Sequence, residues 1–183
     1  NPLPTEPLIF LKAPTSVIGP ATAVVLPPES SRVDFEGEIA LVVKHRLRRV
    51  TATEALAGIL GVTCANDVSA RDLQKRDGSF SGAKSFDTFC PLGPAILLDP
   101  DFAGLEVRTR VNGVERQHGR VGEMVFGFAE LLAYASCRMT LEPGDIFLTG
   151  TPAGVGPLAD GDRIEVEIPG VGSLANPVEA FKQ

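Results

Sequence analysis

Three carboxylates are the residues of this sequence best suited to chemistry. Glu36 and Glu38 lie one residue apart in the apolar run DFEGEIALVV, and Asp67 follows the apolar run GVTCA. Because successive side chains of a strand alternate between its faces, Glu36 and Glu38 share one face. Two like charges on a covered face repel each other and lose hydration unless a cation lies between them. The pattern therefore suggests a metal site.

Each of these residues also has a more ordinary interpretation. A bare E-x-E pair lies more often at a solvated strand end than at a metal. Asp67 precedes Ser-Ala-Arg, where an aspartate commonly caps the N-terminus of a helix. The spacing alone leaves both interpretations open.

The donor atoms indicate which metals would fit. Three carboxylates are hard oxygen ligands, which favour Mg²⁺, Mn²⁺ or Ca²⁺ over zinc. They exceed the charge of a divalent ion by one, so an anionic substrate needs additional positive charge nearby. Arg71, four residues after Asp67, could share a helix face with it or form a surface salt bridge. Lys84 lies in Gly-Ala-Lys-Ser-Phe, a context too apolar for a routine surface lysine.

The elements around these residues are mostly strands. Apolar and β-branched patterns predict strands over residues 8–11, 35–43, 61–65, 95–98, 105–111, 146–149 and 163–168. Asn112-Gly113 predicts a two-residue hairpin turn. Helices are predicted from a capping box at Thr51 and Glu54 through Leu60, over 126–138, and as a short turn over 69–75. The fold class is α+β with a strand-dominated core.

Composition and charge limit the class of protein. The 183 residues, of which 44% are hydrophobic and 22% charged, fit a single folded domain over 1–183. A net charge of −6 argues against nucleic-acid binding, which needs a basic surface. No apolar run approaches the roughly 20 residues that span a bilayer. Cys64, Cys90 and Cys137 lack zinc-ligand spacing, so we expect reduced thiols in a cytoplasmic protein that binds a small molecule.

Other catalytic schemes find little support in the sequence. The glycine-rich residues 149–156 contain neither G-x-G-x-x-G nor a Gly-Lys-Ser/Thr ending, so they predict a tight loop rather than a nucleotide site. His45 lies in a basic turn and His118 beside the hairpin strand, and neither has a nucleophile to serve.

Four motifs together resemble the fumarylacetoacetate hydrolase family. In order they are DFEGEIALVV, NDVSARDLQ, GAKSFDTFCPLGP and TLEPGDIFLTGTPAGVG, and the similarity runs from residue 6 to residue 178. The resemblance implies a mixed β-roll, usually homodimeric, and a Mg²⁺ or Mn²⁺ ion, with Ca²⁺ as a possible substitute, held by Glu36, Glu38 and Asp67. It implies that Lys84 is catalytic. The implied substrate-binding residues are Arg71, Gln74, Lys84, Gly150 and Thr151.

The resemblance and the ligand chemistry predict a divalent-metal-dependent enzyme acting on small 2-oxo or 1,3-diketo acids. The expected reaction is C–C hydrolysis of an acylpyruvate-like substrate, or decarboxylation, through an enolate that the metal and Lys84 stabilise. An isomerase of 2-hydroxyhepta-2,4-diene-1,7-dioate is an alternative, because tautomerisation needs no activated water. A non-catalytic dimeric binding protein of this family is a second alternative. Hydrolytic and decarboxylating members carry an additional His and Glu on a lid, and we expect that segment upstream of Asn1.

Overall fold

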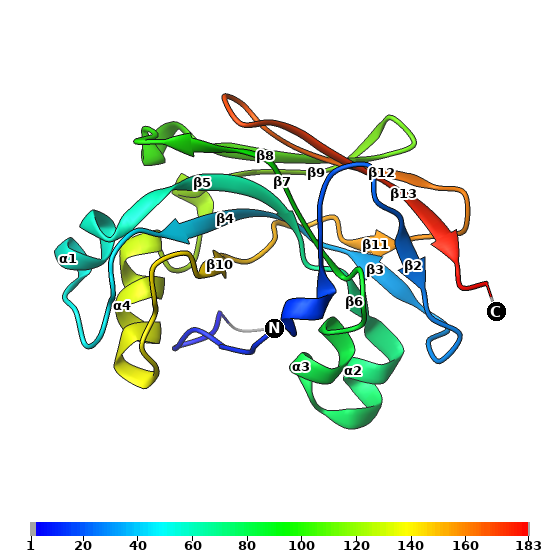
Figure 1. The fold of residues 1–183 in the computed structure, drawn as a ribbon, viewed down its shortest axis with the longest axis horizontal. Coiled ribbons are helices and arrows are strands. Elements are labelled where there is room, and N and C mark those ends of the chain that lie inside the picture. The colour runs from blue at the N-terminus through cyan, green and yellow to red at the C-terminus, as the bar shows by residue number, and fades with distance from the viewer. Residues whose placement is uncertain (1–2, 183) are drawn as a thin grey trace.

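The computed structural model describes residues 3–182 and is dominated by strands that form three sheets (Figure 1). The strands are β1 (Val17–Ile18), β2 (Val24–Leu26), β3 (Val33–Phe35), β4 (Gly37–Val43), β5 (Ile59–Asn66), β6 (Ser69–Ala70), β7 (Cys90–Leu98), β8 (Glu106–Val111), β9 (Val114–Arg120), β10 (Ile146–Leu148), β11 (Gly156–Pro157), β12 (Arg163–Ile168) and β13 (Gly172–Ala180). The helices are α1 (Ala52–Ala57), α2 (Arg71–Asp77), α3 (Phe80–Lys84) and α4 (Phe128–Arg138), with 3-10 turns η1 (Pro14–Ser16), η2 (Phe102–Gly104) and η3 (Val121–Glu123).

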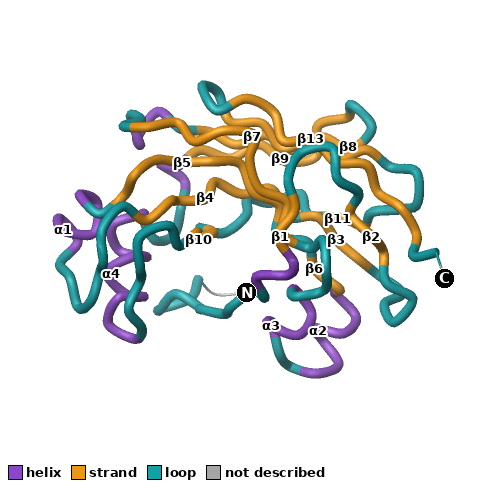
Figure 2. The backbone as a smooth tube through the Cα atoms, in the orientation of Figure 1, coloured by secondary structure: helices purple, strands orange, loops and turns teal. Residues whose placement is uncertain are grey.

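Two five-stranded sheets lie one above the other, and a small third sheet joins them at one end. The first has the order β1-β7-β5-β4-β10, the second β2-β13-β12-β8-β9, and the small sheet β11-β3-β6. The curved strands arch over the N-terminal segment, and helices lie below them (Figures 1 and 2). This architecture confirms the predicted strand-dominated α+β class.

The main core lies between the two large sheets and extends to α4. Leu41 of β4, Val62 of β5 and Val166 of β12 belong to it, and Leu132 adds the buried stripe of α4. All seven residues of β4 are buried, which confirms that this strand is covered on both faces, as its continuous apolar run suggested. Glu38 thus lies on one of the most enclosed strands of residues 3–182, and Glu36 immediately precedes that strand.

Most predicted elements are present, with shifted ends. The strand expected over 35–43 is interrupted at Glu36, and the one expected over 95–98 begins earlier, at Cys90. The 163–168 strand and the Asn112-Gly113 turn are confirmed, and both turn residues have positive φ, 52° and 78°. The long strand β13 was not predicted. Residues 172–177 of this strand pair with β12 and residues 178–180 pair with β2, so long-range pairing rather than local pattern establishes it.

The helices agree with the capping and periodicity signals. The capping box at Thr51 and Glu54 is formed, but α1 ends at Ala57, because the backbone from Ile59 onward pairs with β4. The short helix predicted over 69–75 begins at Arg71, since Ser69–Ala70 pairs with β3 instead. The helix predicted over 126–138 begins at Phe128. In residues 3–182, none of the helices has the length and apolar character needed to span a bilayer.

The strand predicted over 8–11 is wrong. Residues 8–12 are irregular in the structure. The reason is that their backbone donors bond to α3 and its end: Leu11 N–H donates to Ser81 Oγ at 3.2 Å and Ala13 N–H to Ser85 Oγ at 3.0 Å. Hydrogen bonds to side-chain acceptors replace those that a neighbouring strand would supply. We call residues 8–12 the strap, because these bonds hold them alongside α3.

Candidate metal centre and active site

The backbone brings Glu36 and Asp67 together at the point where two pairs of strands separate. Glu36 lies between β3 and β4, and Asp67 lies between β5 and β6. Glu36 N–H donates to Asn66 Oδ1 at 3.0 Å, while Asp67 N–H donates to the Glu36 carbonyl at 2.8 Å. These two bonds fix the acidic residues side by side, although 30 residues separate them in the chain.

Gly37 allows β4 to pass closely beneath the second five-stranded sheet, β2-β13-β12-β8-β9, which we call the outer sheet. A Cβ at this position would lie 1.9 Å from Thr109 Oγ1, which is too close for any side chain. The glycine between the two glutamates is therefore required by packing. It places β4 against β8 while Glu36 and Glu38 remain on the cavity side.

Glu36, Glu38 and Asp67 form a compact, buried carboxylate cluster. Each offers one oxygen, and these atoms all lie within 4.8 Å of one another. Burial, followed by the nearby charges of Asp67 and Glu36, raises the pKa of Glu38 well above its ordinary value. The oxygen donors, their spacing and their enclosure fit a hard divalent cation, which would offset this repulsion. The described residues thus fit the Mg²⁺ or Mn²⁺ ion that the sequence suggested.

Lys84 lies at the centre of the site, as the apolar context of this lysine indicated. It ends α3, is 2% exposed, and places Nζ 2.9 Å from Glu36 Oε2 and 2.6 Å from Asp67 Oδ2. The ring of Phe10 covers the ammonium group at 5.0 Å. Asp67 contacts cations and does not cap α2, whose N-cap is Ala70, so the capping interpretation is wrong.

Lys12 is a site residue that the sequence analysis missed. Its Nζ lies 2.6 Å from Asp67 Oδ1 and donates to the Lys84 carbonyl at 2.5 Å. The available signal was the same as for Lys84, a single lysine within an apolar segment. The contacts of Lys12 depend on the irregular path of residues 8–12 across the cluster, which the strand pattern over 8–11 does not predict.

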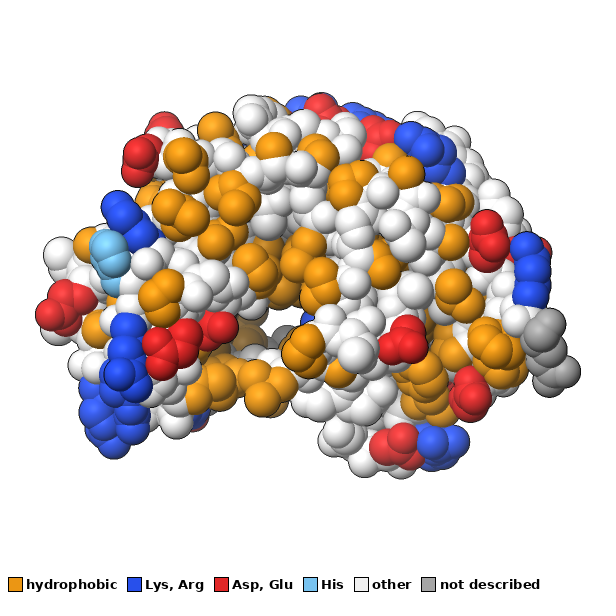
Figure 3. Space-filling model, in the orientation of Figure 1, with side chains coloured by type: hydrophobic (Ala, Val, Ile, Leu, Met, Phe, Trp, Pro, Cys, Tyr) orange, Lys and Arg blue, Asp and Glu red, His pale blue; other side chains and the backbone are white. Residues whose placement is uncertain are grey.

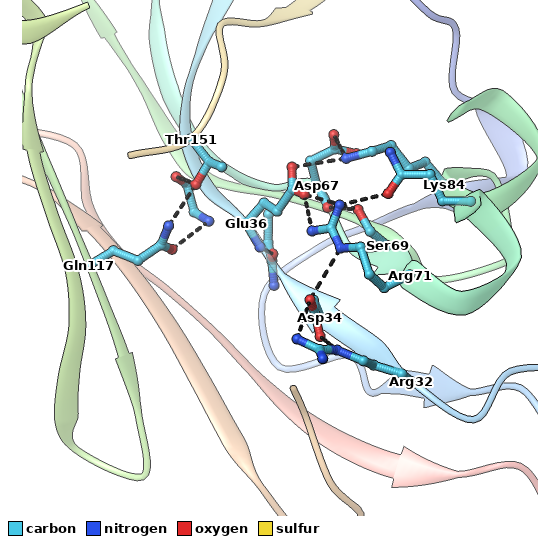
Figure 4. Close-up of polar contacts among 12 residues, drawn as sticks. Arg32, Asp34, Glu36, Asp67, Ser69, Arg71, Lys84, Gln117 and Thr151 are labelled. Carbon is cyan, nitrogen blue, oxygen red and sulfur yellow. Dashed lines mark hydrogen bonds and ion pairs between the residues drawn. The ribbon is translucent and has the colours of Figure 1, made fainter. Parts of the chain in front are cut away.

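Arg71 also contacts the cluster, but through Glu36 rather than through Asp67, the partner that the sequence suggested. Its guanidinium pairs with Glu36 and with Asp34, where Nε lies 3.1 Å from Asp34 Oδ2, and it makes no ion pair with Asp67 among the described residues. Arg71 Nη1 donates to Gln74 Oε1 at 2.7 Å, which holds both side chains on the cavity wall. Figure 4 shows Arg71 between Asp34 and the Glu36–Asp67 pair.

The loop after β10 closes the opposite side of the site. Gly150, with φ of 98°, donates its N–H to Glu38 Oε2 at 2.6 Å. Thr151 Oγ1 donates to the Gly37 carbonyl at 2.9 Å and accepts from Gln117 Nε2 at 2.7 Å. Gln117 Oε1 in turn accepts from Gly37 N–H at 3.0 Å, so this buried amide clamps the E-x-E strand to the loop (Figure 4).

Together these groups line a cavity of about 290 Å³ that contains the carboxylate cluster, Arg71, Gln74, Lys84, Gly150 and Thr151. Every site residue predicted from the sequence thus lies on one cavity. The space-filling view is hollowed between the N-terminal segment and the sheets above it, with hydrophobic side chains at its edge (Figure 3). His45 and His118 lie elsewhere; His118 Nε2 contacts Glu106 on the outer sheet at 3.0 Å.

Comparison with known proteins supports the same family. Residues 1–179 match the family described as fumarylacetoacetate (FAA) hydrolase C-terminal. The solved structure of 5-carboxymethyl-2-hydroxymuconate delta-isomerase from Mycobacterium smegmatis superposes with a TM-score of 0.96 at 45% identity, covering 100% of this chain and 73% of that one. The 2-hydroxyhepta-2,4-diene-1,7-dioate isomerase from Mycobacterium marinum has a TM-score of 0.95 at 49% identity, covering 98% and 71%.

A human relative extends the comparison to another reaction. Oxaloacetate tautomerase FAHD2A, mitochondrial, from Homo sapiens is 44% identical over 189 residues, which are 97% of this chain. The chain spans only 60% of that relative's length. The match over residues 1–179 and the identities of these relatives lead to one conclusion: the chain belongs to the fumarylacetoacetate hydrolase family.

Proposed function

We propose that this protein is a Mg²⁺- or Mn²⁺-dependent enzyme that interconverts keto and enol forms of small 2-oxo acids. The observation that carries the proposal is the position of Lys84, buried between Glu36 and Asp67 in the cavity that holds the three carboxylates. When bound, the divalent ion would supply a Lewis acid for the 2-oxo and carboxylate oxygens of the substrate.

The charges of the site favour an anionic substrate. It contains four carboxyl groups and four cationic side chains close to them: Asp34, Glu36, Glu38 and Asp67 beside Lys12, Arg32, Arg71 and Lys84. A bound divalent cation would add positive charge to this set. That charge could offset the substrate carboxylate and the oxygen that becomes negative as the enol forms.

Lys84 and Lys12 can stabilise the negative charge that develops on the substrate oxygen as the enol forms. With the carboxylates engaged by a cation, the ammonium groups of Lys84 and Lys12 can donate hydrogen bonds to substrate oxygen instead. Such donors act strongly in an enclosed site, because their position is fixed in advance. Phe10 stacks on Phe80, with 5.5 Å between ring centroids, and covers Lys84 from solvent. Tautomerisation moves one proton from carbon 3 of the substrate to its 2-oxygen, so a C–H bond breaks as an O–H bond forms, and it needs no activated water.

Hydrolysis or decarboxylation at a C–C bond, the reaction expected first from the sequence, is the second candidate. The family name and the shared 2-oxo acid chemistry favour it. Hydrolysis also requires a base that activates water. Isomerisation comes first because two of the solved structures most similar to this chain, with TM-scores of 0.96 and 0.95, are isomerases.

A substrate panel tests the proposal. Acylpyruvates, oxaloacetate and the dienedioate are assayed with Mg²⁺, with Mn²⁺ and with EDTA; loss of enol absorbance follows tautomerisation, and release of pyruvate follows acylpyruvate hydrolysis. We expect turnover that EDTA abolishes. Absence of EDTA-sensitive turnover on every compound would overturn the proposal and favour a binding protein. The homodimer also stays a prediction, which sedimentation can test.

A further inference from the structure

Gln117 is a buried amide that hydrogen-bonds to two sides of the active site from behind its wall. It lies on β9 of the outer sheet and is 2% exposed. Its Oε1 accepts from Gly37 N–H at 3.0 Å, and its Nε2 donates to Thr151 Oγ1 at 2.7 Å and to the Pro152 carbonyl at 2.9 Å (Figure 4). Gly37 separates the two glutamates of the cluster, and Thr151 lines the cavity. One side chain thus joins the metal-ligand strand to the opposite wall.

The chemistry of these partners fixes the direction of the amide. A backbone N–H can only donate and a carbonyl can only accept, so Oε1 faces Gly37 and Nε2 faces Pro152. Because Nε2 is a donor, Thr151 Oγ1 accepts from it, which leaves the hydroxyl proton for the Gly37 carbonyl at 2.9 Å. Gln117, Thr151 and Gly37 therefore form a closed ring of hydrogen bonds that holds the threonine hydroxyl in one orientation.

Two glycines allow the loop after β10 to lie directly against β9. A Cβ at Gly119 would be 2.6 Å from Pro152 Cβ, and a Cβ at Gly154 would be 2.0 Å from the Arg116 carbonyl oxygen. Gly154 also has φ of 104°, which favours glycine. β9 is therefore the support of this loop, and Gln117 extends from the support to Gly37.

The carboxylates are held largely by other contacts. Glu36 N–H donates to Asn66 Oδ1 at 3.0 Å and Asp67 N–H donates to the Glu36 carbonyl at 2.8 Å, and neither bond involves Gln117. The loop meets the cluster at a single glutamate, where Gly150 N–H donates to Glu38 Oε2 at 2.6 Å. Loss of the ring should therefore displace the loop more than the cluster.

We propose that Gln117 is a positioning residue of the active site, which sets the loop that carries Gly150 and Thr151 relative to the carboxylate cluster. It acts through Gly37 and Thr151 rather than by contact with the ligand. The inference rests on the proposed function for a 2-oxo acid bound between the metal and this loop. A displacement of binding groups by about 1 Å can cost about 100-fold in activity, so a fixed loop matters to such a site.

Calorimetry on the manganese-loaded protein tests the role of Gln117, with pyruvate as the probe. Gln117→Met keeps the length of the side chain and removes its three hydrogen bonds. Pyruvate should bind at least about tenfold more weakly, whereas Mn²⁺ affinity should change by less than about threefold. Gln117→Asn keeps an amide but is one methylene too short to reach Gly37 and Thr151 together, so it gives the same test if the methionine variant does not fold.

Asn176 supplies a matched control on the same sheet. It lies on β13, is 1% exposed, and its Nδ2 donates to the carbonyls of Gly19 at 2.9 Å and Thr22 at 2.8 Å. Asn176→Leu also removes a buried amide that holds a loop, so it should lower Tm but leave pyruvate affinity unchanged.

The outcomes separate the two proposals. Unchanged pyruvate affinity in a folded Gln117 variant, an equal loss in Asn176→Leu, or a loss of Mn²⁺ affinity as large as that for pyruvate would overturn the positioning role. Each of these results leaves the proposed function intact. If the wild-type protein binds Mn²⁺ but not pyruvate, both proposals are overturned, because the site then does not hold a 2-oxo acid.

Discussion

The chain contains two E-x-E pairs, one where β3 meets β4 and one on β12, and they have opposite environments. Glu36 and Glu38, at the start of β4, are 8% and 3% exposed and cluster with Asp67. On β12 of the outer sheet, the side chains of Glu165 and Glu167 are 29% and 35% exposed. The same spacing gives a candidate metal centre in one place and a solvated ion pair in the other.

The partners of the two pairs differ accordingly. Glu165 and Glu167 share Arg110, whose Nη1 lies 3.5 Å and 2.5 Å from them. Such exposed pairs contribute about 0 to 1 kcal/mol each. Glu38 has no ion pair among residues 3–182 and accepts a backbone bond from Gly150. Enclosure by the fold, and for Glu38 the lack of a cationic partner among these residues, suits the first pair to a metal, and spacing alone does not achieve this.

The largest difference between the two pairs should appear in metal affinity. Glu38→Gln removes a ligand charge and should weaken Mn²⁺ binding by more than about 100-fold, whereas the matched change Glu165→Gln should leave it unchanged. Calorimetric titration measures both, and circular dichroism checks that both variants fold. Equal affinity in the two variants would show that the buried cluster is not the metal site.

A second contrast concerns the cations that accompany the two pairs. Lys84→Met should lower kcat by about 100-fold or more, because it removes a fixed donor from the enclosed site. Arg110→Met, on the outer sheet, should leave kcat unchanged. Steady-state kinetics on a substrate turned over by the wild type measures both, and retained Mn²⁺ binding shows that the Lys84 variant is folded. Normal kcat in Lys84→Met would remove this residue from the mechanism.

The smallest expected effect is the pH dependence of stability that arises from the contacts of Glu106 on the outer sheet. The hydrogen bond with His118, together with that from Arg108, lowers the pKa of Glu106 below its ordinary value of 4.5. Ionised Glu106 therefore stabilises the folded state above pH 4.5, and this contribution is lost as the pH falls through the lowered pKa. The Tm of Glu106→Gln should lie slightly below that of the wild type at pH 7. This difference should disappear on acidification; a difference that grows would contradict the assignment.

The sequence by itself determined the character of the two glutamate strands. The run GEIALVV is continuously apolar after its glutamate, which indicates cover on both faces, and the pattern over 163–168 predicts the strand that carries the second pair. Local chemistry also predicted the capping box at Thr51 and the Asn112-Gly113 turn, because each depends on neighbouring residues alone.

Only the tertiary structure decided how the charges of the site combine. Lys12 reaches Asp67 from 55 residues away, and Gln117 clamps Gly37 to Thr151 from 80 and 34 residues away. It also assigned Arg71 to Asp34 and Glu36 rather than to Asp67. These contacts depend on how strands distant in the chain pair and on which side chains the strap and α3 bring over them. Residue types and spacing therefore indicated the candidate ligands of the site, and the packing of distant segments supplied their enclosure and their counter-charges.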